Sequence, residues 1–383
     1  MCRLMIYKGK HEILLSELIL SPTHSILMQS FDSRLRVDSR RPHNGDGFGI
    51  GYYTTPSLGT EPCIFTSTIP AWNCKNLSRI ASKTKSSLLF AHLRATTEGN
   101  LSDSNCHPFF YRSLMFMHNG GIGFFKQIKR RLALSLNEQW FTFIQGSTDS
   151  EWAFALFLDC LDKSGHHPDF KPSKGGFGHT VLRKAILQTI QLINGFIKEA
   201  VGEQGNGDSR SLLNFAVTDG ESVVCTRYVS SKTDEASSLF FSSGSSWNEA
   251  KSKQQQKDHS GSEDKFGCCF EPGKKDYIME RRDKGSDIVL VASEPLTFER
   301  DNWVTVPTNS TLTIHKQTVL IHPIIDEFYS SDPAHARSTG FARARGQTVT
   351  GPDKHILPHI EAEKPGSGIV SAKSVMIGGL KEG

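Results

Sequence analysis

The first residue that could carry out chemistry is Cys2, which directly follows Met1. A small residue at position 2 permits removal of the initiator methionine, which leaves Cys2 with a free α-amino group. That amine titrates near ~7.7–8.0 and can accept the thiol proton at neutral pH, directly or through a water molecule. The sequence therefore offers a thiol nucleophile with its own base; the alternative is that Cys2 is simply the second residue of a cytosolic protein.

A run of alternating glycines follows in RPHNGDGFGIGYY (41–53). Glycine at every second position leaves one face of a strand without side chains, so that a ligand or another backbone can approach closely. A phosphate-binding GxGxxG loop is excluded because Tyr52 stands where its last glycine is needed. Asp46 and Gly47 therefore mark either a turn beside a ligand or an ordinary hairpin turn.

The segment AHLRATTEG (91–99) places an arginine and two hydroxyl groups directly after a buried strand. His92 and Arg94 share one face because strand residues alternate. A guanidinium with the neighbouring hydroxyls of Thr96 and Thr97 suits a two-point grip on a substrate carboxylate. The alternative is that Arg94 pairs with a structural acid.

The segment HNGG (118–121) ends another strand pattern. The side-chain amide of Asn119 and the backbone N–H of Gly120 form two convergent donors, as an oxyanion hole requires when a carbonyl becomes tetrahedral. The alternative is an ordinary turn, since Asn-Gly is a common turn dipeptide.

An acidic residue begins an apolar helix pattern in GSTDSEWAFALF (146–157). Asp149 is placed either to hold a substrate ammonium group or to cap the helix. The sequence leaves both roles open.

Neither a metal, a cofactor nor nucleic acid is expected. His92, Cys106, His107 and His118 are plausible ligands, but no pair has zinc-finger spacing and HEILL (11–15) is not the HExxH motif. The net charge is +4, from 44 Lys and Arg against 40 Asp and Glu, which is too balanced to indicate nucleic-acid or membrane-surface binding.

Eleven strand patterns and three helical ones must position these residues. The helices are expected over 124–136, 150–163 and 180–200, and Asp219-Gly220 predicts a hairpin turn. Hairpin-like strands with helices clustered between strand groups favour an α+β fold of antiparallel sheets covered by helices. The strands are expected over 2–7, 48–53, 63–68, 87–95, 113–118, 212–218, 222–228, 238–243, 287–293, 311–316 and 318–323.

Composition indicates a globular cytoplasmic protein with one folded domain, over 2–330. Hydrophobic residues make up 37% of the 383 positions, no apolar run approaches the ~18 residues that span a bilayer, and no secretion signal is evident. Eight cysteines without a CxxC pair indicate reduced thiols. The last 53 positions, 331–383, hold one of the 36 aromatic residues, so a mostly disordered tail is expected there, and a long surface loop over 248–275.

Five motifs in a fixed order resemble the class II glutamine amidotransferases, which are N-terminal nucleophile hydrolases. They are Cys2, NGDGFG (44–49), HLRATT (92–97), HNGG (118–121) and GSTDSE (146–151), and the resemblance spans roughly 2–323. A still closer resemblance is to the stand-alone amidotransferase-like subunit of the fungal cytosolic complex that degrades glutathione. It is carried by MCR (1–3), FDSRLR (31–36), NCHPF (105–109) and SEPLTFER (293–300).

The resemblance implies a four-layer αββα sandwich of two antiparallel sheets, in agreement with the expected elements. It also implies roles by position: Cys2 as the nucleophile, Asn119 and Gly120 as the oxyanion hole, Arg94 and Thr97 as the grip on the α-carboxylate, Asp149 as the acid that holds the α-amino group, and Asp46 and Gly47 as the turn beside the nucleophile.

One departure from the family bears on the expected function. Many synthase-linked members carry His after the Thr of the arginine motif, where this chain has Glu98, and no synthase domain follows. The resemblance therefore implies cleavage of the γ-glutamyl bond of glutathione, in a complex with a metallopeptidase-like subunit. The alternatives are a glutaminase-type subunit that supplies ammonia to a separate synthase, acting on glutamine, and a non-catalytic scaffold.

Overall fold

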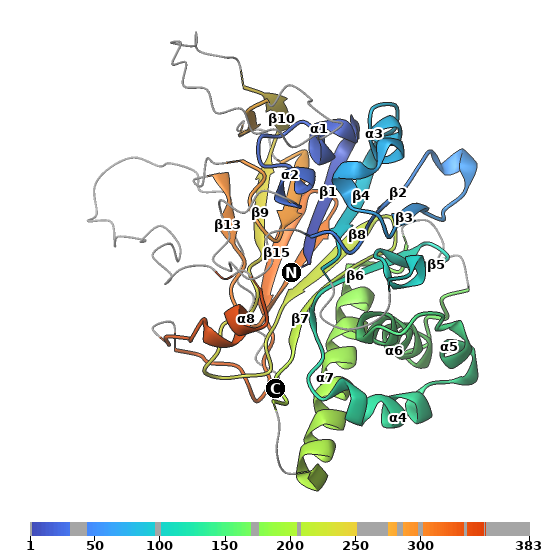
Figure 1. Cartoon of the computed structure of the whole chain (residues 1–383), viewed down its shortest axis with the longest axis vertical. Helices are drawn as coiled ribbons and strands as arrows, with labels where there is room; N and C mark the ends of the chain where they lie inside the picture. The colour runs from blue at the N-terminus through green and yellow to red at the C-terminus, as the bar shows by residue number, and fades with distance from the viewer. Residues whose placement is uncertain are drawn as a thin grey trace.

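Two antiparallel sheets stack face to face at the centre of the molecule, with helices on both outer sides (Figure 1). The computed structural model describes residues 2–30, 44–95, 101–169, 176–204, 208–250, 275–281, 286–297, 302–332, 335–347 and 349. The layers are the four-layer αββα sandwich predicted from the sequence.

The first sheet contains the N-terminal strand. β1 (Arg3–Leu14) lies at its centre, between β12 (Ile288–Ala292) and β4 (Lys85–Leu93), and is antiparallel to both. The start of the chain is therefore flanked by two strands from distant parts of the sequence. The other strands of this sheet are β2 (Phe48–Tyr52), β3 (Cys63–Ser67), β9 (Phe240–Gly244) and β13 (Val304–Thr305).

The second sheet is a six-stranded antiparallel sheet. Its hairpin β7 (Leu212–Thr218) and β8 (Ser222–Arg227) turns at Asp219-Gly220, as predicted. The Asp219 carboxylate accepts the backbone N–H of Ser222 at 2.7 Å, and Gly220 has φ +93°, which explains the Asp-Gly pair. The remaining strands are β5 (Phe109–Tyr111), β6 (Leu114–Gly121), β14 (Ser310–His315) and β15 (Thr318–Pro323). β10 (Ser246–Glu249) and β11 (Tyr277–Glu280) form a separate two-stranded antiparallel sheet.

Three apolar layers hold the sandwich together. Leu4 and Ile6 of β1 pack against Met115 and Met117 of β6 between the sheets. Helices cover the outer face of each sheet (Figure 1). On the second sheet lie α4 (Phe125–Ser135), α5 (Glu138–Phe143), α6 (Asp149–Lys163) and α7 (His179–Gln204), and on the first lie α1 (Ser16–Ile19), α2 (Ile26–Gln29) and α3 (Lys75–Ala81). Short 3-10 turns lie at Pro56–Leu58, Ala71–Asn73 and Asp103–Asn105.

The three predicted helices are present with small differences. α7 continues to Gln204, four residues beyond the helix expected over 180–200. Most of the loop expected over 248–275 lies outside the described residues, and its first residues belong to β10. None of the helices in the described part of the chain is long and apolar enough to cross a membrane.

Residues 335–347 differ from the expected disordered tail, because they dock on the body of the protein. The Arg337 guanidinium donates to the carbonyls of Ser231, Asp234 and Phe328 at 2.6–3.0 Å, and Phe341 of α8 (Gly340–Ala344) is buried. The low aromatic content of 331–383 predicted disorder, but its single aromatic side chain, Phe341, lies buried against the body of the protein. Residues 351–383 lie outside the described residues.

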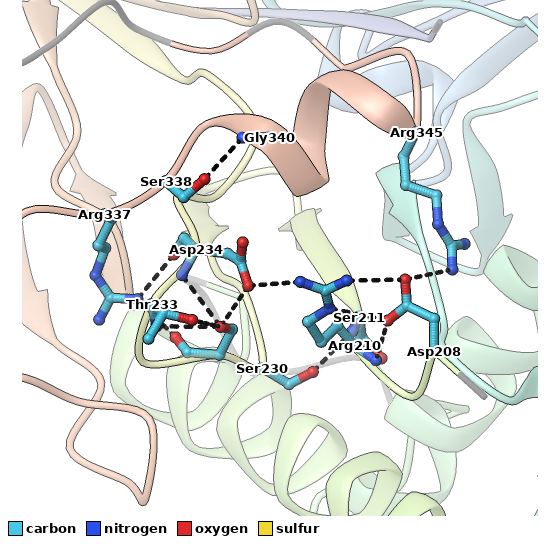
Figure 2. A network of polar contacts seen from close by, with 11 residues as sticks. Asp208, Arg210, Ser211, Ser230, Thr233, Asp234, Arg337, Ser338, Gly340 and Arg345 are labelled. Atoms are coloured by element: carbon cyan, nitrogen blue, oxygen red, sulfur yellow. Dashed lines mark hydrogen bonds and ion pairs between the residues drawn. The ribbon is translucent and has the colours of Figure 1, made fainter. Parts of the chain in front are cut away.

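An ion-pair network fastens this C-terminal segment to the start of β7 (Figure 2). The Arg210 guanidinium lies 4.0 Å from the centre of the Phe341 ring and pairs with Asp208 at 2.9 Å and Asp234 at 2.8 Å. Arg345 pairs with Asp208 from the other side, at 3.5 Å. The segment thus covers the residues that lead into β7.

Candidate active site

Cys2 lies where β1 begins, beside the end of β4. The register that pairs Arg3 with Leu93 brings Cys2 next to the residues that follow Leu93. Cys2 Sγ lies 3.4 Å from the backbone N of Ala95, which can donate to it, and 3.6 Å from the Ala95 carbonyl oxygen. Cys2 is partly exposed, so its sulfur is both positioned and reachable.

Arg94 and the Asp-Gly turn predicted from the sequence lie together beside Cys2. The backbone N–H of Arg94 donates to the Gly47 carbonyl at 2.8 Å, and its guanidinium lies 3.5 Å from the Asp46 carbonyl oxygen. Gly47 has φ +116°, and a Cβ there would lie 2.8 Å from Cys106 Sγ and from the Ser67 carbonyl. Only glycine is compatible with this turn, which explains the DG pair.

Asn119 and Gly120 end β6, at the edge of the second sheet that faces the start of β1. The Asn119 side chain is buried and lies 3.1 Å from Ser293 Oγ, which also accepts the Leu4 backbone N–H at 3.1 Å. Gly120 has φ +156°, and a Cβ there would clash with the carbonyl of Leu212 on β7. Ser293 therefore links Asn119, one of the two predicted oxyanion donors, to the strand that begins after Cys2.

Asp149 is the first residue of α6, and Thr148, not Asp149, is its N-cap. The Asp149 carboxylate accepts the backbone N–H of Ile122 at 2.8 Å, just beyond the glycines of β6. Asp149 therefore does not cap α6; its carboxylate instead links the start of α6 to the residue after β6 by a hydrogen bond. This hydrogen bond places a carboxylate beside Gly121, 3.8 Å from where its Cβ would be.

Three buried histidines lie behind these residues. Burial lowers the pKa of His92 to about 3, and lowers that of His107 and His118 below the ordinary value. His118 Nε2 lies 3.0 Å from the Leu212 carbonyl, so it carries the proton and Nδ1 accepts from Ser150 Oγ at 2.9 Å. All three imidazole rings are therefore neutral at neutral pH.

Burial raises the pKa of three other described cysteines, to about 11 for Cys106 and Cys160 and further for Cys225. Such thiols stay protonated at neutral pH and are poor nucleophiles. Thr97, the remaining predicted residue of the substrate grip, lies outside the described residues.

Two residues that hold the N-terminus in place, Arg3 and Ser293, were not identified from the sequence. The buried Arg3 donates to the Cys2 carbonyl at 3.2 Å and pairs with Glu294 at 2.6 Å. Ser293, directly before Glu294, contacts both Leu4 and Asn119. The signal was present in SEPLTFER (293–300), but no spacing rule relates residues almost 300 positions apart.

The arrangement combines the groups that amide cleavage through a thiol requires. A partly exposed cysteine, an arginine, a carboxylate and an Asn-Gly pair lie where β1 begins and where β4 and β6 end. Their chemistry would serve a substrate with a carboxylate, an ammonium group and a reactive carbonyl.

The chain is similar to known proteins over most of its length. The family model for class II glutamine amidotransferases matches residues 16–192. The chain is 54% identical to the probable glutamine amidotransferase DUG3 of Saccharomyces cerevisiae over 348 residues, 90% of each chain. It is also 28% identical over 124 residues to the gamma-glutamyl-hercynylcysteine sulfoxide hydrolase of Mycobacterium tuberculosis, across 31% of this chain and 49% of that protein.

A solved structure supports the fold. The glutamine aminotransferase class-II domain protein of Silicibacter pomeroyi aligns with a TM-score of 0.50 at 20% identity, over 85% of this chain and all of the other. At that identity the likeness concerns the arrangement of sheets and helices.

Proposed function

The chain belongs to the class II glutamine amidotransferases, and from that premise we propose that it hydrolyses the γ-glutamyl bond of glutathione through Cys2. The observation that carries the proposal is the contact of Cys2 Sγ with Ala95, next to Arg94, opposite the Asn119-Gly120 end of β6. The membership itself makes the protein an amidotransferase-like hydrolase.

The first step forms a thioester. The α-amino group of a processed Cys2 takes the thiol proton, and the thiolate attacks the side-chain carbonyl of the glutamyl group. The Asn119 amide and the Gly120 N–H donate to the oxygen that becomes negative in the tetrahedral intermediate. The protonated amine then gives its proton to the departing nitrogen of cysteinylglycine, the C–N bond breaks, and a γ-glutamyl thioester remains on Cys2.

Water completes the reaction. The same amine takes a proton from water, which attacks the thioester carbonyl, and the second tetrahedral intermediate collapses to glutamate and the Cys2 thiol. Arg94 and Thr97 hold the α-carboxylate and Asp149 holds the α-amino group throughout both steps, with Asp46 and Gly47 forming the turn beside the thiol. No cofactor takes part in this scheme.

Two observations favour a glutathione-type substrate. Glutathione carries the same α-amino and α-carboxylate groups as glutamine, at the same distance from a side-chain amide. The Mycobacterium tuberculosis relative is named for hydrolysis of a γ-glutamyl derivative of a cysteine compound. We further propose a cytoplasmic complex in which a metallopeptidase-like subunit closes the pocket over the cysteinylglycine half.

The test compares glutamate release from three substrates: glutathione, L-glutamine and α-glutamylcysteine. An α-peptide uses the carboxylate that Arg94 would hold, so release from it is expected to be slower by several powers of ten, as for a site with an unpaired polar group. Each assay uses the full chain alone and with the protein that co-purifies with it, and the Cys2→Ala chain is the control.

The outcomes separate the candidate functions. Glutathione turnover that requires Cys2 supports the proposal. Glutamine turnover with no glutathione turnover under every pairing would indicate the ammonia-supplying subunit. Equal rates on the γ- and α-glutamyl substrates would contradict the assigned grip, and a Cys2→Ala chain that still supports the activity of the complex would indicate a scaffold.

A further inference from the structure

Ser293 is the point where the nucleophile strand and the Asn-Gly strand share a contact. It is fully buried and directly follows β12. Its Oγ accepts the backbone N–H of Leu4, two residues after Cys2, at 3.1 Å. The same oxygen lies 3.1 Å from the side-chain amide nitrogen of Asn119.

The hydrogen-bond pattern at this point leaves two groups without partners. Asn119 Nδ2 donates to Ser293 Oγ, whereas Asn119 Oδ1 is buried and has no partner among the described residues. Ser293 Oγ then receives two N–H donors, and its own proton has no acceptor within the part of the chain that the structure describes. A buried polar group left unsatisfied is unfavourable, because it has lost its hydrogen bonds to water without replacing them.

Exchanging the oxygen and nitrogen of the Asn119 amide satisfies both groups. The two ends of an amide have nearly the same shape, so their assignment follows from the surrounding hydrogen bonds. In the exchanged orientation the Ser293 hydroxyl donates to Asn119 Oδ1 and still accepts from Leu4 N–H. Asn119 Nδ2, with both its protons, is then turned away from Ser293.

We propose that Ser293 is a positioning residue that holds Asn119 Oδ1 through its hydroxyl and thereby aims Asn119 Nδ2 at the substrate carbonyl. This inference rests on the proposed role of Asn119 as an oxyanion donor. The inference assigns a function to Ser293, the first residue of the SEPLTFER (293–300) motif, which has no role in the proposed mechanism.

The other contacts of Ser293 direct its hydroxyl proton toward Asn119 Oδ1. Its backbone N–H donates to the Leu4 carbonyl at 3.0 Å, and its carbonyl accepts from Ser238 Oγ at 2.8 Å. With the backbone held on both sides and one lone pair of Oγ occupied by Leu4 N–H, the hydroxyl proton faces Asn119. An aliphatic side chain at position 293 would leave Asn119 able to turn its oxygen toward the substrate, where it repels the developing charge.

The experiment measures kcat and KM of full-length Ser293→Ala and Ser293→Thr, on whichever of glutathione or L-glutamine the wild type hydrolyses faster. Active sites are counted by stoichiometric labelling of Cys2 with a diazo-ketone glutamine analogue, so that a loss of folded enzyme is not mistaken for a loss of rate. Ser242→Ala is the matched control, because Ser242 is a fully buried serine of the same sheet whose hydroxyl has no partner among the described residues.

We expect kcat per labelled site to fall about 10–100-fold in Ser293→Ala, somewhat less than the loss of a whole oxyanion donor, with little change in KM. Ser293→Thr keeps the hydroxyl and should recover most of the rate, and Ser242→Ala should match the wild type. Wild-type kcat in a folded Ser293→Ala chain would overturn the inference. If the alanine variant does not fold, Ser293→Cys, with a weak donor of similar size, takes its place and should also lose rate.

A double variant separates this inference from the proposed function. If Ser293 acts through Asn119, then Asn119→Ala/Ser293→Ala should be no slower than Asn119→Ala alone. Additive losses would show that Ser293 acts elsewhere and overturn the inference. An Asn119→Ala chain with wild-type kcat would instead remove the oxyanion role on which both depend.

Discussion

At the scale of single residues, the site depends on how Arg94 presents its guanidinium. Arg94 is buried, its backbone N–H donates to the Gly47 carbonyl at 2.8 Å, and its guanidinium lies 3.5 Å from the Asp46 carbonyl oxygen. A planar fork held in this way can bind both oxygens of a carboxylate, whereas an ammonium group binds as a single point charge.

The Arg94→Lys chain should therefore bind its γ-glutamyl substrate poorly while it stays folded. We expect a loss on the order of 2–4 kcal/mol in kcat/KM, the usual cost of breaking one buried charge-paired contact. Steady-state kinetics of glutamate release would measure it, with Arg112→Lys as the control, since that side chain is 57% exposed. A kcat/KM close to the wild-type value would mean that Arg94 is structural.

At the scale of elements, β4, β6 and the segment between them bring three histidines into contact. The His92 and His107 ring centres lie 4.1 Å apart, and neither ring nitrogen of His107 has a partner among the described residues. In the unfolded chain these rings titrate near ~6.5. Because burial lowers their folded pKa, the unfolded state binds more protons below that pH.

The protein should therefore lose stability as the pH falls below about 6.5, by roughly 1.4 kcal/mol per pH unit for each buried histidine. His107→Phe removes one of these groups and should make that loss shallower, at no cost in stability at pH 7.5. Urea unfolding at pH 7.5, 6 and 5 tests this, with the exposed His11→Gln as the control. The same pH dependence in wild type and His107→Phe would contradict it.

The C-terminal segment is a second element with a measurable contribution. Phe341→Ala removes the ring that packs against Leu212 and Val229 and stacks under Arg210. We expect it to lower the free energy of unfolding by about 2–4 kcal/mol, toward the lower end for a phenylalanine because the cluster is small. Arg343→Ala, on the exposed face of α8, should change it by less than about 0.5 kcal/mol. Equal free energies of unfolding for the two variants, measured by urea denaturation, would show that docking of the C-terminal segment does not stabilise the protein.

Elements with a long apolar run or a clear turn signal were predictable, and those without one were not. The sequence predicts β7, β8 and α6 because each is an almost unbroken run of buried residues, and the Asp219-Gly220 pair marks the hairpin turn. It predicts β1 only to residue 7, because Lys10, His11 and Glu12 are exposed and interrupt the pattern before the strand ends at Leu14. α5 has one buried side chain, Trp140, which is too few to form a period.

At the scale of the whole molecule, the start of β1 is enclosed by strands that come from across the sequence. The motifs around Cys2, Arg94, Asn119 and Asp149 are each local, so their presence was predictable. The contacts of Ser293 with Leu4 and Asn119 join positions 289 and 174 residues apart, and no local pattern encodes them.

Because the chain enters the site with Cys2, any peptide left ahead of that residue should abolish activity without affecting the fold. The proposed base is the Cys2 α-amino group, and an amide nitrogen cannot replace it, so glutamate release should fall at least about 100-fold. Melting temperature and activity of an N-terminally extended chain test this. The control is the same chain after a protease has exposed Cys2. Full activity with the extension in place would exclude the amine as the base.

The contact between Leu4 and Ser293 also determines when the N-terminal strand can complete its packing during synthesis, because it cannot form before Ser293 has been made. The N-terminus is synthesised first, yet the strand that flanks it and the serine that it contacts come 289 residues later. At 5–20 residues per second, that interval is roughly 15–60 seconds. During it, β1 has no β12 beside it, and Cys2 can be trimmed of its methionine with no pocket around it. The nascent thiol is therefore open to oxidants and electrophiles before it can select a substrate.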